Sequence, residues 1–166
     1  MIRVVVLCLA VGCRSDGDRT MPKDFSLEYT WIEGSMPPPH HYEYTIAIDS
    51  AGHGTVTYHP DYPEHRKPPW VEKFDVSRER LETLYPRIRE LVLDRKWKEQ
   101  SDPPVGGSYS WLRATGGGRS ASTPTHPIDG EALPKLYDEI RGLVPKAVWD
   151  DLSARREKFV REYREK

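Results

Sequence analysis

The sequence predicts an α+β fold in which an antiparallel sheet carries helices packed on one face. The first observation is a strand–turn–strand pattern that occurs twice, at residues 42–59 and 108–124. The second is that each pattern precedes a segment with helical apolar spacing, at 81–92 and 133–144. A further amphipathic segment closes the chain. We therefore expect two hairpin–helix units followed by a C-terminal helix.

Two more segments have an apolar residue at every second position, which is the period of a half-buried strand. They are FSLEYTWI at 25–32 and WVEKFDV at 70–76. Both are predicted to add strands to the sheet.

The first hairpin has a predictable register. In the stretch DSAG, we take the three residues after Asp49 as the turn, with Gly52 in the left-handed conformation. Apolar residues then face apolar residues across the strands, Ile46 with Val56 and Tyr44 with Tyr58. In the second hairpin, the run Gly116–Gly118 is the expected turn.

The two helical segments match without gaps at an offset of 52 residues, and a tryptophan continues the match beyond them. Most identical positions lie on one helical stripe, so amphipathic spacing explains part of the similarity. The identical pairs are Leu81/Leu133, Leu84/Leu136, Tyr85/Tyr137, Ile88/Ile140, Arg89/Arg141, Leu91/Leu143, Val92/Val144 and Trp97/Trp149.

The ends of these helices are also marked in the sequence. Ser77 and Asp129 are the expected N-caps, because short polar side chains accept hydrogen bonds from the first turn. Pro86 lies inside the first helix, where it removes a backbone hydrogen bond, so we expect a kink or a later start there. The final helix, KAVWDDLSARREKFVREY, places Val148, Trp149, Leu152, Phe159 and Tyr163 on one side.

The N-terminus has the pattern of an export signal. A positively charged start precedes an apolar run, Val4 to Val11, whose length fits the central region of a signal peptide. The alternative is a buried first strand of an α/β fold. The stretch that follows, CRSDGDRTMPKD, is polar and has no apolar period, so it does not continue into a crossover helix. An export signal is the better interpretation.

Ala10, Val11, Gly12 and Cys13 occupy the four places of a lipobox, although Ala10 stands where Leu is usual. The N-terminus thus resembles a bacterial lipoprotein signal. This resemblance implies cleavage before Cys13, a lipid on Cys13 and membrane anchoring. In that family an Asp after the cysteine often retains the protein at the inner membrane. Arg14 stands there, so the resemblance implies the outer membrane if the cell has one.

The chain then divides into a signal peptide (1–12), a lipidated polar tether (13–24) and one α+β domain (25–166). Cys8 would be removed and Cys13 modified, which leaves no thiol for a disulfide, a nucleophile or a metal ligand. The net charge is −1, and acidic and basic residues are interleaved. This excludes the clustered basic face that nucleic-acid binding requires.

The order of elements over roughly residues 25–145 is similar to that of small extracytoplasmic bacterial domains that repeat a hairpin–helix unit. The resemblance rests on pattern and includes no catalytic motif. It implies a fold and an envelope location, and no activity.

Five of the six histidines fall between positions 40 and 65. The predicted register places Glu43 opposite His59 and, if the strands extend that far, His41 opposite Asp61. Two imidazoles and two carboxylates suit Zn²⁺, which accepts nitrogen and oxygen ligands. The alternative is an ordinary solvated hairpin face, with pairing ended early by Pro60.

Four aromatic residues flank the proline-rich loops SMPPPHH and YPEHRKPPW. Such loops are already extended and can present side chains to a partner. Tyr42, Tyr58, Tyr62 and Trp70 are therefore the candidate partner-binding residues, although a core role is the default for aromatic side chains.

We therefore expect a lipid-anchored cell-envelope protein that binds an envelope protein partner, without catalytic activity, cofactor or nucleic acid. The alternative is a zinc-binding protein or a metal-dependent hydrolase that uses His41, Glu43, His59 and Asp61. A third possibility is a purely structural envelope component.

Overall fold

The computed structural model describes residues 20–62, 68–102, 106–128 and 130–165. The predicted signal peptide and Cys13 lie outside these ranges. The described part forms a six-stranded antiparallel sheet with three α-helices, so the predicted α+β class is confirmed. The elements in chain order are β1 Ser26–Ile32, β2 Glu43–Asp49, β3 His53–His59, β4 Trp70–Asp75, α1 Arg78–Ile88, the π-helical turn η3 Arg89–Leu93, β5 Tyr109–Gly116, β6 Arg119–Ser122, α2 Leu133–Arg141 and α3 Lys146–Arg164.

The strands follow the order β4-β3-β2-β1-β5-β6. Strand β1 therefore lies at the centre, with the β2–β3 hairpin on one side and the β5–β6 hairpin on the other. Each of its residues has an antiparallel partner on both neighbours, such as Tyr29 with Ile46 and Leu112. The first strand of the domain thus joins two hairpins that are far apart in the sequence.

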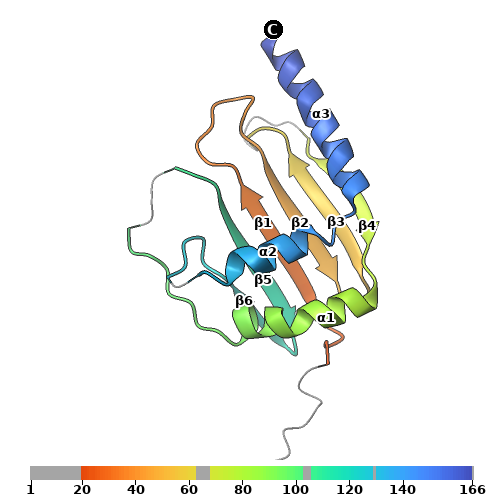
Figure 1. Ribbon diagram of the computed structural model, residues 1–166, viewed down its shortest axis with the longest axis vertical. Coiled ribbons are helices and arrows are strands. Elements are labelled where there is room, and N and C mark those ends of the chain that lie inside the picture. The colour runs from red at the N-terminus through yellow and green to blue at the C-terminus, as the bar shows by residue number, and fades with distance from the viewer. Residues whose placement is uncertain (1–19, 63–67, 103–105, 129, 166) are drawn as a thin grey trace, which may run out of the picture.

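The core lies between the sheet and the helices. Helices α1 and α2 run across the strands on one face of the sheet (Figure 1). Ring contacts tie β1 and the residue before it to both helices: Phe25 meets Tyr85 edge-on at 5.3 Å, and Tyr29 meets Tyr137 at 5.0 Å. All twelve of the shared apolar positions within the matched helical segments are buried, which explains their spacing.

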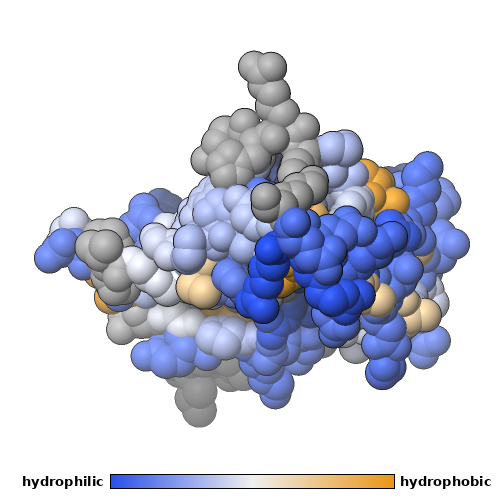
Figure 2. Space-filling view, turned by 90° about the horizontal axis from the view of Figure 1, so that it is seen from above, coloured by the Kyte–Doolittle hydropathy of each residue, from blue (hydrophilic) through white to orange (hydrophobic). Residues whose placement is uncertain are grey.

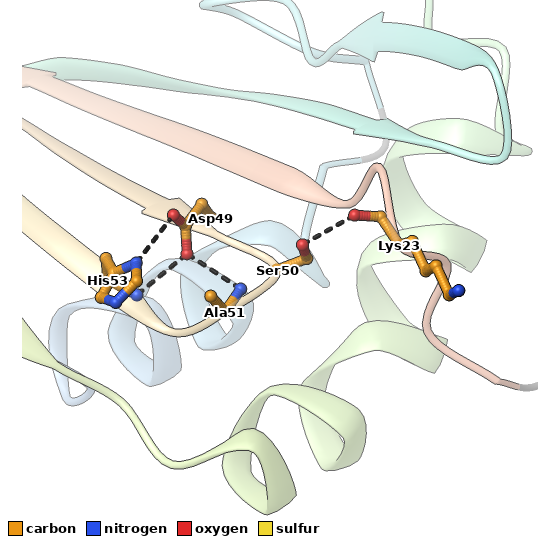
Figure 3. Close-up of polar contacts among 5 residues, drawn as sticks. All are labelled: Lys23, Asp49, Ser50, Ala51 and His53. Carbon is orange, nitrogen blue, oxygen red and sulfur yellow. Dashed lines mark hydrogen bonds and ion pairs between the residues drawn. The ribbon is translucent and has the colours of Figure 1, made fainter.

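The β2–β3 hairpin has the register that the sequence predicts, with Ile46 opposite Val56 and Tyr44 opposite Tyr58. Gly52 adopts the expected left-handed conformation, with φ of 92°. The Asp49 carboxylate closes the turn by accepting hydrogen bonds from the backbone of Ala51 and His53, each at 2.9 Å (Figure 3). Ser50 Oγ donates to the Lys23 carbonyl at 2.7 Å, which ties the turn to the segment before β1.

The β5–β6 turn is shorter than expected. Gly116 belongs to β5, and the turn is made by Gly117 and Gly118, with φ of 61° and 70°. Both backbone N–H groups donate to the Asp24 carboxylate, at 2.9 and 2.7 Å. The residues just before β1 therefore hold the tips of both hairpins.

Helix α1 starts where predicted, because the Ser77 hydroxyl accepts from the Arg80 N–H at 3.4 Å. The helix continues through Pro86, and the expected late start is wrong. The hydrogen-bond pattern instead widens to the π-helical turn η3 three residues after the proline. A π-helical turn is one way in which a helix changes its backbone hydrogen-bond pattern without ending.

The predicted cap of α2 is also wrong. The helix begins at Leu133 with Ala132 in the N-cap position and no side-chain cap. Pro134 stands in the first turn, where a missing N–H costs nothing. Asp129 precedes this start by too many residues to cap it and lies outside the described residues.

Candidate functional site

A row of aromatic side chains crosses the end of the sheet from which α3 projects. Trp31 of β1, Tyr44 of β2, Tyr58 of β3 and Trp70 of β4 are consecutive partners in the strand register. Directly opposed residues point to the same face, so the four rings form one line. Their centroids are 5.5, 6.3 and 5.5 Å apart, and neighbouring planes differ by 17° or less.

Helix α3 packs on this row and then continues past the sheet (Figure 1). Trp149 contacts Tyr44 edge-on with centroids 5.1 Å apart, and Phe159 contacts Trp70 in the same way at 6.5 Å. Arg155 adds an ion pair to Glu72 of β4 at 2.7 Å. The row from Tyr44 to Trp70 is thus contacted by the last helix.

A groove of about 850 Å³ lies between α3 and the row. Its wall on the sheet side is formed by tyrosines, and its wall on the helix side combines apolar and charged side chains. The lining residues are His40, Tyr42, Tyr44, Tyr58, Arg141, Trp149, Leu152, Ser153, Arg156, Glu157, Val160 and Arg161.

The Arg156 guanidinium is fixed in this groove by three contacts. It lies over the Tyr42 ring at 3.9 Å, a cation–π distance. It donates a hydrogen bond to the His40 carbonyl at 2.7 Å. A second guanidinium nitrogen donates to the His41 carbonyl at 3.4 Å. Arg156 therefore has little freedom, and a ligand would not have to order it.

Arg141 lies beside Tyr44, a tyrosine of the row. Its guanidinium lies near the Tyr44 hydroxyl, lines the same groove and forms an ion pair with Asp138. The Tyr44 ring in turn contacts the Tyr29 ring, with centroids 6.2 Å apart. The groove thus holds two arginines, each beside a tyrosine.

The tyrosine hydroxyls of the groove stay protonated at neutral pH. Burial raises the pKa of Tyr42, Tyr44 and Tyr58 above the ordinary phenol value. Interactions with the arginines oppose this effect but do not outweigh it. The site consequently presents protonated phenols and guanidinium groups, all of which can donate hydrogen bonds.

The groove is also positively charged. Arg141, Arg156 and Arg161 line it against the Glu157 carboxylate, and Arg141 is also paired with Asp138 next to the groove. Donor groups and positive charge together favour a ligand that carries anionic oxygen atoms. Seen from the end toward which α3 projects, the surface is largely hydrophilic, with hydrophobic residues in small separate patches (Figure 2). Recognition on this side therefore depends on specific polar contacts.

The predicted metal ligands are only partly brought together. Glu43 and His59 are opposite one another at the open end of the hairpin, as the register requires. The strands end there, so His41 and Asp61 are not a ladder pair. Both are nevertheless buried, at 3% exposure each.

His41 has an unusual environment for a buried polar group. Its ring is stacked on Tyr62 with centroids 3.7 Å apart and planes within 4°. Neither of its ring nitrogens has a hydrogen-bond partner, and the same is true of His59 Nδ1. Within the ranges that the structure describes, no group of three or more His, Cys, Asp or Glu side chains is placed to hold a metal ion.

Three of the four predicted partner-binding residues belong to the groove or to the aromatic row. Tyr42 and Tyr58 line the groove, and Trp70 is stacked on Tyr58. Tyr62 lies elsewhere, where its hydroxyl donates to the Met36 carbonyl at 2.9 Å. It fastens the proline-rich loop instead of facing the groove.

The sequence interpretation missed the arginines of the site. Trp149, Leu152, Arg156, Phe159 and Tyr163 follow one another at helical spacings of three and four, so Arg156 stands in the middle of an apolar stripe. A charged residue in such a position is a signal for a specific role. Arg141 gave no comparable signal. It matches Arg89 at the 52-residue offset, so the sequence presents it as part of the repeated helix pattern and not as a residue with a role of its own.

In comparisons with known proteins, the sequence matches no protein-family model and no curated protein. In the described part of the chain, none of the helices combines the length and the apolar character that crossing a membrane requires.

Proposed function

We propose that this chain is a lipid-anchored cell-envelope protein whose folded part binds a protein partner and catalyses no reaction. The anchor would be a lipid on Cys13, with the outer membrane favoured by Arg14. The N-terminal pattern supports the anchor, and the groove between α3 and the sheet supports the binding role.

The arrangement of Arg141 and Arg156 carries the binding proposal. Arg156 is held by the Tyr42 ring and the His40 carbonyl, and Arg141 by Asp138, at the edge of a groove large enough for several side chains. General acid–base catalysis needs a group whose pKa lies near the working pH. His40 and Glu157 also line the groove, but its guanidinium groups and its phenols with a raised pKa do not meet that requirement. Fixed donors of this kind suit recognition.

The binding proposal can be tested by crosslinking from intact membranes. The full chain, Arg156→Ala and the matched control Arg78→Ala would be compared. Arg78 is exposed on α1, where it pairs with Glu82. We expect the wild-type chain and the Arg78 variant to recover the same partner, and the Arg156 variant to lose it. If the wild-type chain recovers no specific partner, the proposal is wrong.

The location is tested separately with Cys13→Ala. Wild type should appear in the membrane fraction and the variant should not. If both remain in the cytoplasm, the export interpretation fails, and Cys8 and Cys13 return as thiols of the folded protein.

A metal-binding function is the second candidate, because three imidazole nitrogens of His41 and His59 are buried without a hydrogen-bond partner. Such nitrogens are costly unless something binds them. A site built on His41, Glu43, His59 and Asp61 would require His41 to turn away from Tyr62. Metal analysis of protein purified without an affinity tag, followed by zinc titration, tests this candidate. Absence of saturable zinc binding tighter than about 10 µM would eliminate it.

We further propose that the fold consists of two related hairpin–helix units. The ion pair between Arg87 and Glu139 supports this, because the two residues are 52 positions apart, the same offset as the sequence match. The indole N–H groups of Trp97 and Trp149 support it too. Each donates to a backbone carbonyl near the end of the preceding helix, Leu91 in one case and Arg141 in the other.

A further inference from the structure

The chemistry of the groove limits what it can bind. Its lining includes two guanidinium groups beside tyrosines: Arg156 lies over the Tyr42 ring and donates to the His40 carbonyl, and Arg141 is paired with Asp138. Lining residues with a formal charge are Arg141, Arg156 and Arg161 against Glu157, and the Asp138 carboxylate next to the groove is paired with Arg141, which leaves one positive charge in excess. The chain as a whole has a net charge of −1. The groove is thus a local positive site on a slightly acidic protein, which selects for anionic groups.

The size of the groove argues against a single small ion as its ligand. A volume of about 850 Å³ is within the range of sites for organic molecules and far exceeds a phosphate or a carbonate. Trp149 and Val160, both partly exposed, contribute apolar surface beside the arginines. A matching ligand therefore combines anionic oxygen atoms with apolar groups.

The ring faces argue against sugars and nucleobases, which bind by stacking on exposed aromatic planes. Tyr58 is stacked against Tyr42 and Trp70, with centroids 5.5 Å away in each case. The Tyr42 ring also carries the Arg156 guanidinium. The faces of these rings are occupied by neighbours, so the tyrosines offer hydroxyl groups rather than stacking platforms.

We infer that the groove binds an acidic peptide segment of the partner, with carboxylates on Arg141 and Arg156 and apolar side chains against Trp149 and Val160. An extended segment that alternates acidic and apolar residues fits this arrangement, because guanidinium groups pair with carboxylates in a planar, two-point geometry. The inference deepens the proposed binding function and rests on it for the biological partner, but it is testable with purified protein alone.

The test uses the full chain in detergent and two fluorescent peptides, Glu-Leu-Glu-Leu-Glu and the matched control Gln-Leu-Gln-Leu-Gln, with binding read by anisotropy. We expect saturable binding of the acidic peptide only, weakening as salt rises. Arg156→Ala should lower the affinity about 10-fold or more, since a hydrogen-bonded charge pair is lost. Arg78→Ala should leave it within about twofold.

Two further variants guard against misfolding. Arg156→Lys keeps the positive charge but loses the planar, two-point hydrogen-bonding geometry of the guanidinium. It should therefore bind the peptide more tightly than Arg156→Ala but less tightly than wild type. Ser153→Glu adds a carboxylate at an exposed lining position without disturbing the core, and should weaken binding of the acidic peptide about 10-fold. Near-ultraviolet circular dichroism checks that each variant is folded.

The outcomes are distinct. Equal binding of both peptides, no saturation up to about 1 mM, or unchanged affinity in folded Arg156→Ala would each overturn the inference. Binding to phosphatidylglycerol vesicles that depends on Arg156, without peptide binding, would overturn it in favour of a lipid headgroup. If the peptide fails while crosslinking still depends on Arg156, the proposed function stands and only the peptide class is wrong. If the peptide binds but membranes yield no partner, the proposed function fails instead.

Discussion

Arg87 of α1 and Glu139 of α2 form an ion pair between corresponding positions of the two matched helical segments. A contact between equivalent residues is expected where two copies of a unit pack around an approximate twofold axis. The pair lies at the surface, with about a third of each side chain exposed, at 34% and 37%. It therefore joins the two helices without being part of the core.

This pair should make a small, measurable contribution to stability. A double-mutant cycle with Arg87→Ala and Glu139→Ala is expected to give a coupling of about 0.5 kcal/mol in urea unfolding, as for other partly exposed ion pairs. The coupling should shrink in high salt because the charges are screened. The control is the cycle of Arg87→Ala with Glu82→Ala. Glu82 pairs with Arg78 and not with Arg87, so this cycle should show no coupling. Equal coupling in the two cycles would contradict a specific contact.

Much of the fold was predictable because local rules fix it. The register of the β2–β3 hairpin followed from the DSAG turn and from matching the apolar faces, and Ser77 marked the start of α1. The errors came where packing overrode local preference. Helix α1 continues through Pro86 because its four buried residues hold both sides of the proline against the sheet. In the same way, α2 starts at Leu133 without a polar cap, because Leu133 and Leu136 are buried.

The site was less predictable because its parts are far apart in the sequence. Arg156 reaches the carbonyl of His40 across 116 positions, and no local period connects the two. Alternation predicts that Tyr44 and Tyr58 face the covered side of the sheet. Which helix covers them depends on where α3 lies, and that follows from the whole topology.

The two turn glycines should respond differently to substitution. Gly52→Ala requires a left-handed alanine, and its Cβ would collide with the Val76 carbonyl oxygen. We expect a loss of at least about 2 kcal/mol in the free energy of unfolding. Gly118 has a similar φ of 70°, but a Cβ added there would have no neighbour within 4 Å, so Gly118→Ala should cost only about 1 kcal/mol. Chemical denaturation measures both. Equal losses would show that the Val76 contact is unimportant.

Asp24 should make stability depend on acid pH. Hydrogen bonds from the backbone of Gly118 and Gly117 lower the pKa of this carboxyl below its ordinary value. Because the pKa is lowered on folding, the ionised Asp24 carboxyl contributes fully to stability above its pKa in the unfolded chain, about 4. This contribution is lost as the pH falls through the pKa of Asp24 in the folded protein. Asp24→Ala should therefore be less stable than wild type at neutral pH, and the difference should narrow as the pH falls below about 4. Thermal unfolding at neutral pH and at successively lower pH values measures this, and a difference independent of pH would contradict it.

His41 should be a site where a conservative change stabilises the protein. Its ring is buried and stacked on Tyr62, yet both nitrogens have no hydrogen-bond partner. Phenylalanine keeps the stacking and removes the unpaired polar atoms, so His41→Phe should raise the free energy of unfolding by about 1 kcal/mol. The control is His53→Phe, because His53 is exposed and bonded to Asp49, and this change should give no gain. Urea unfolding in the presence of a chelator and with added zinc completes the test. If His41→Phe instead lowers stability, and does so only when zinc is present, the nitrogens have a metal partner in solution and the second candidate function is favoured.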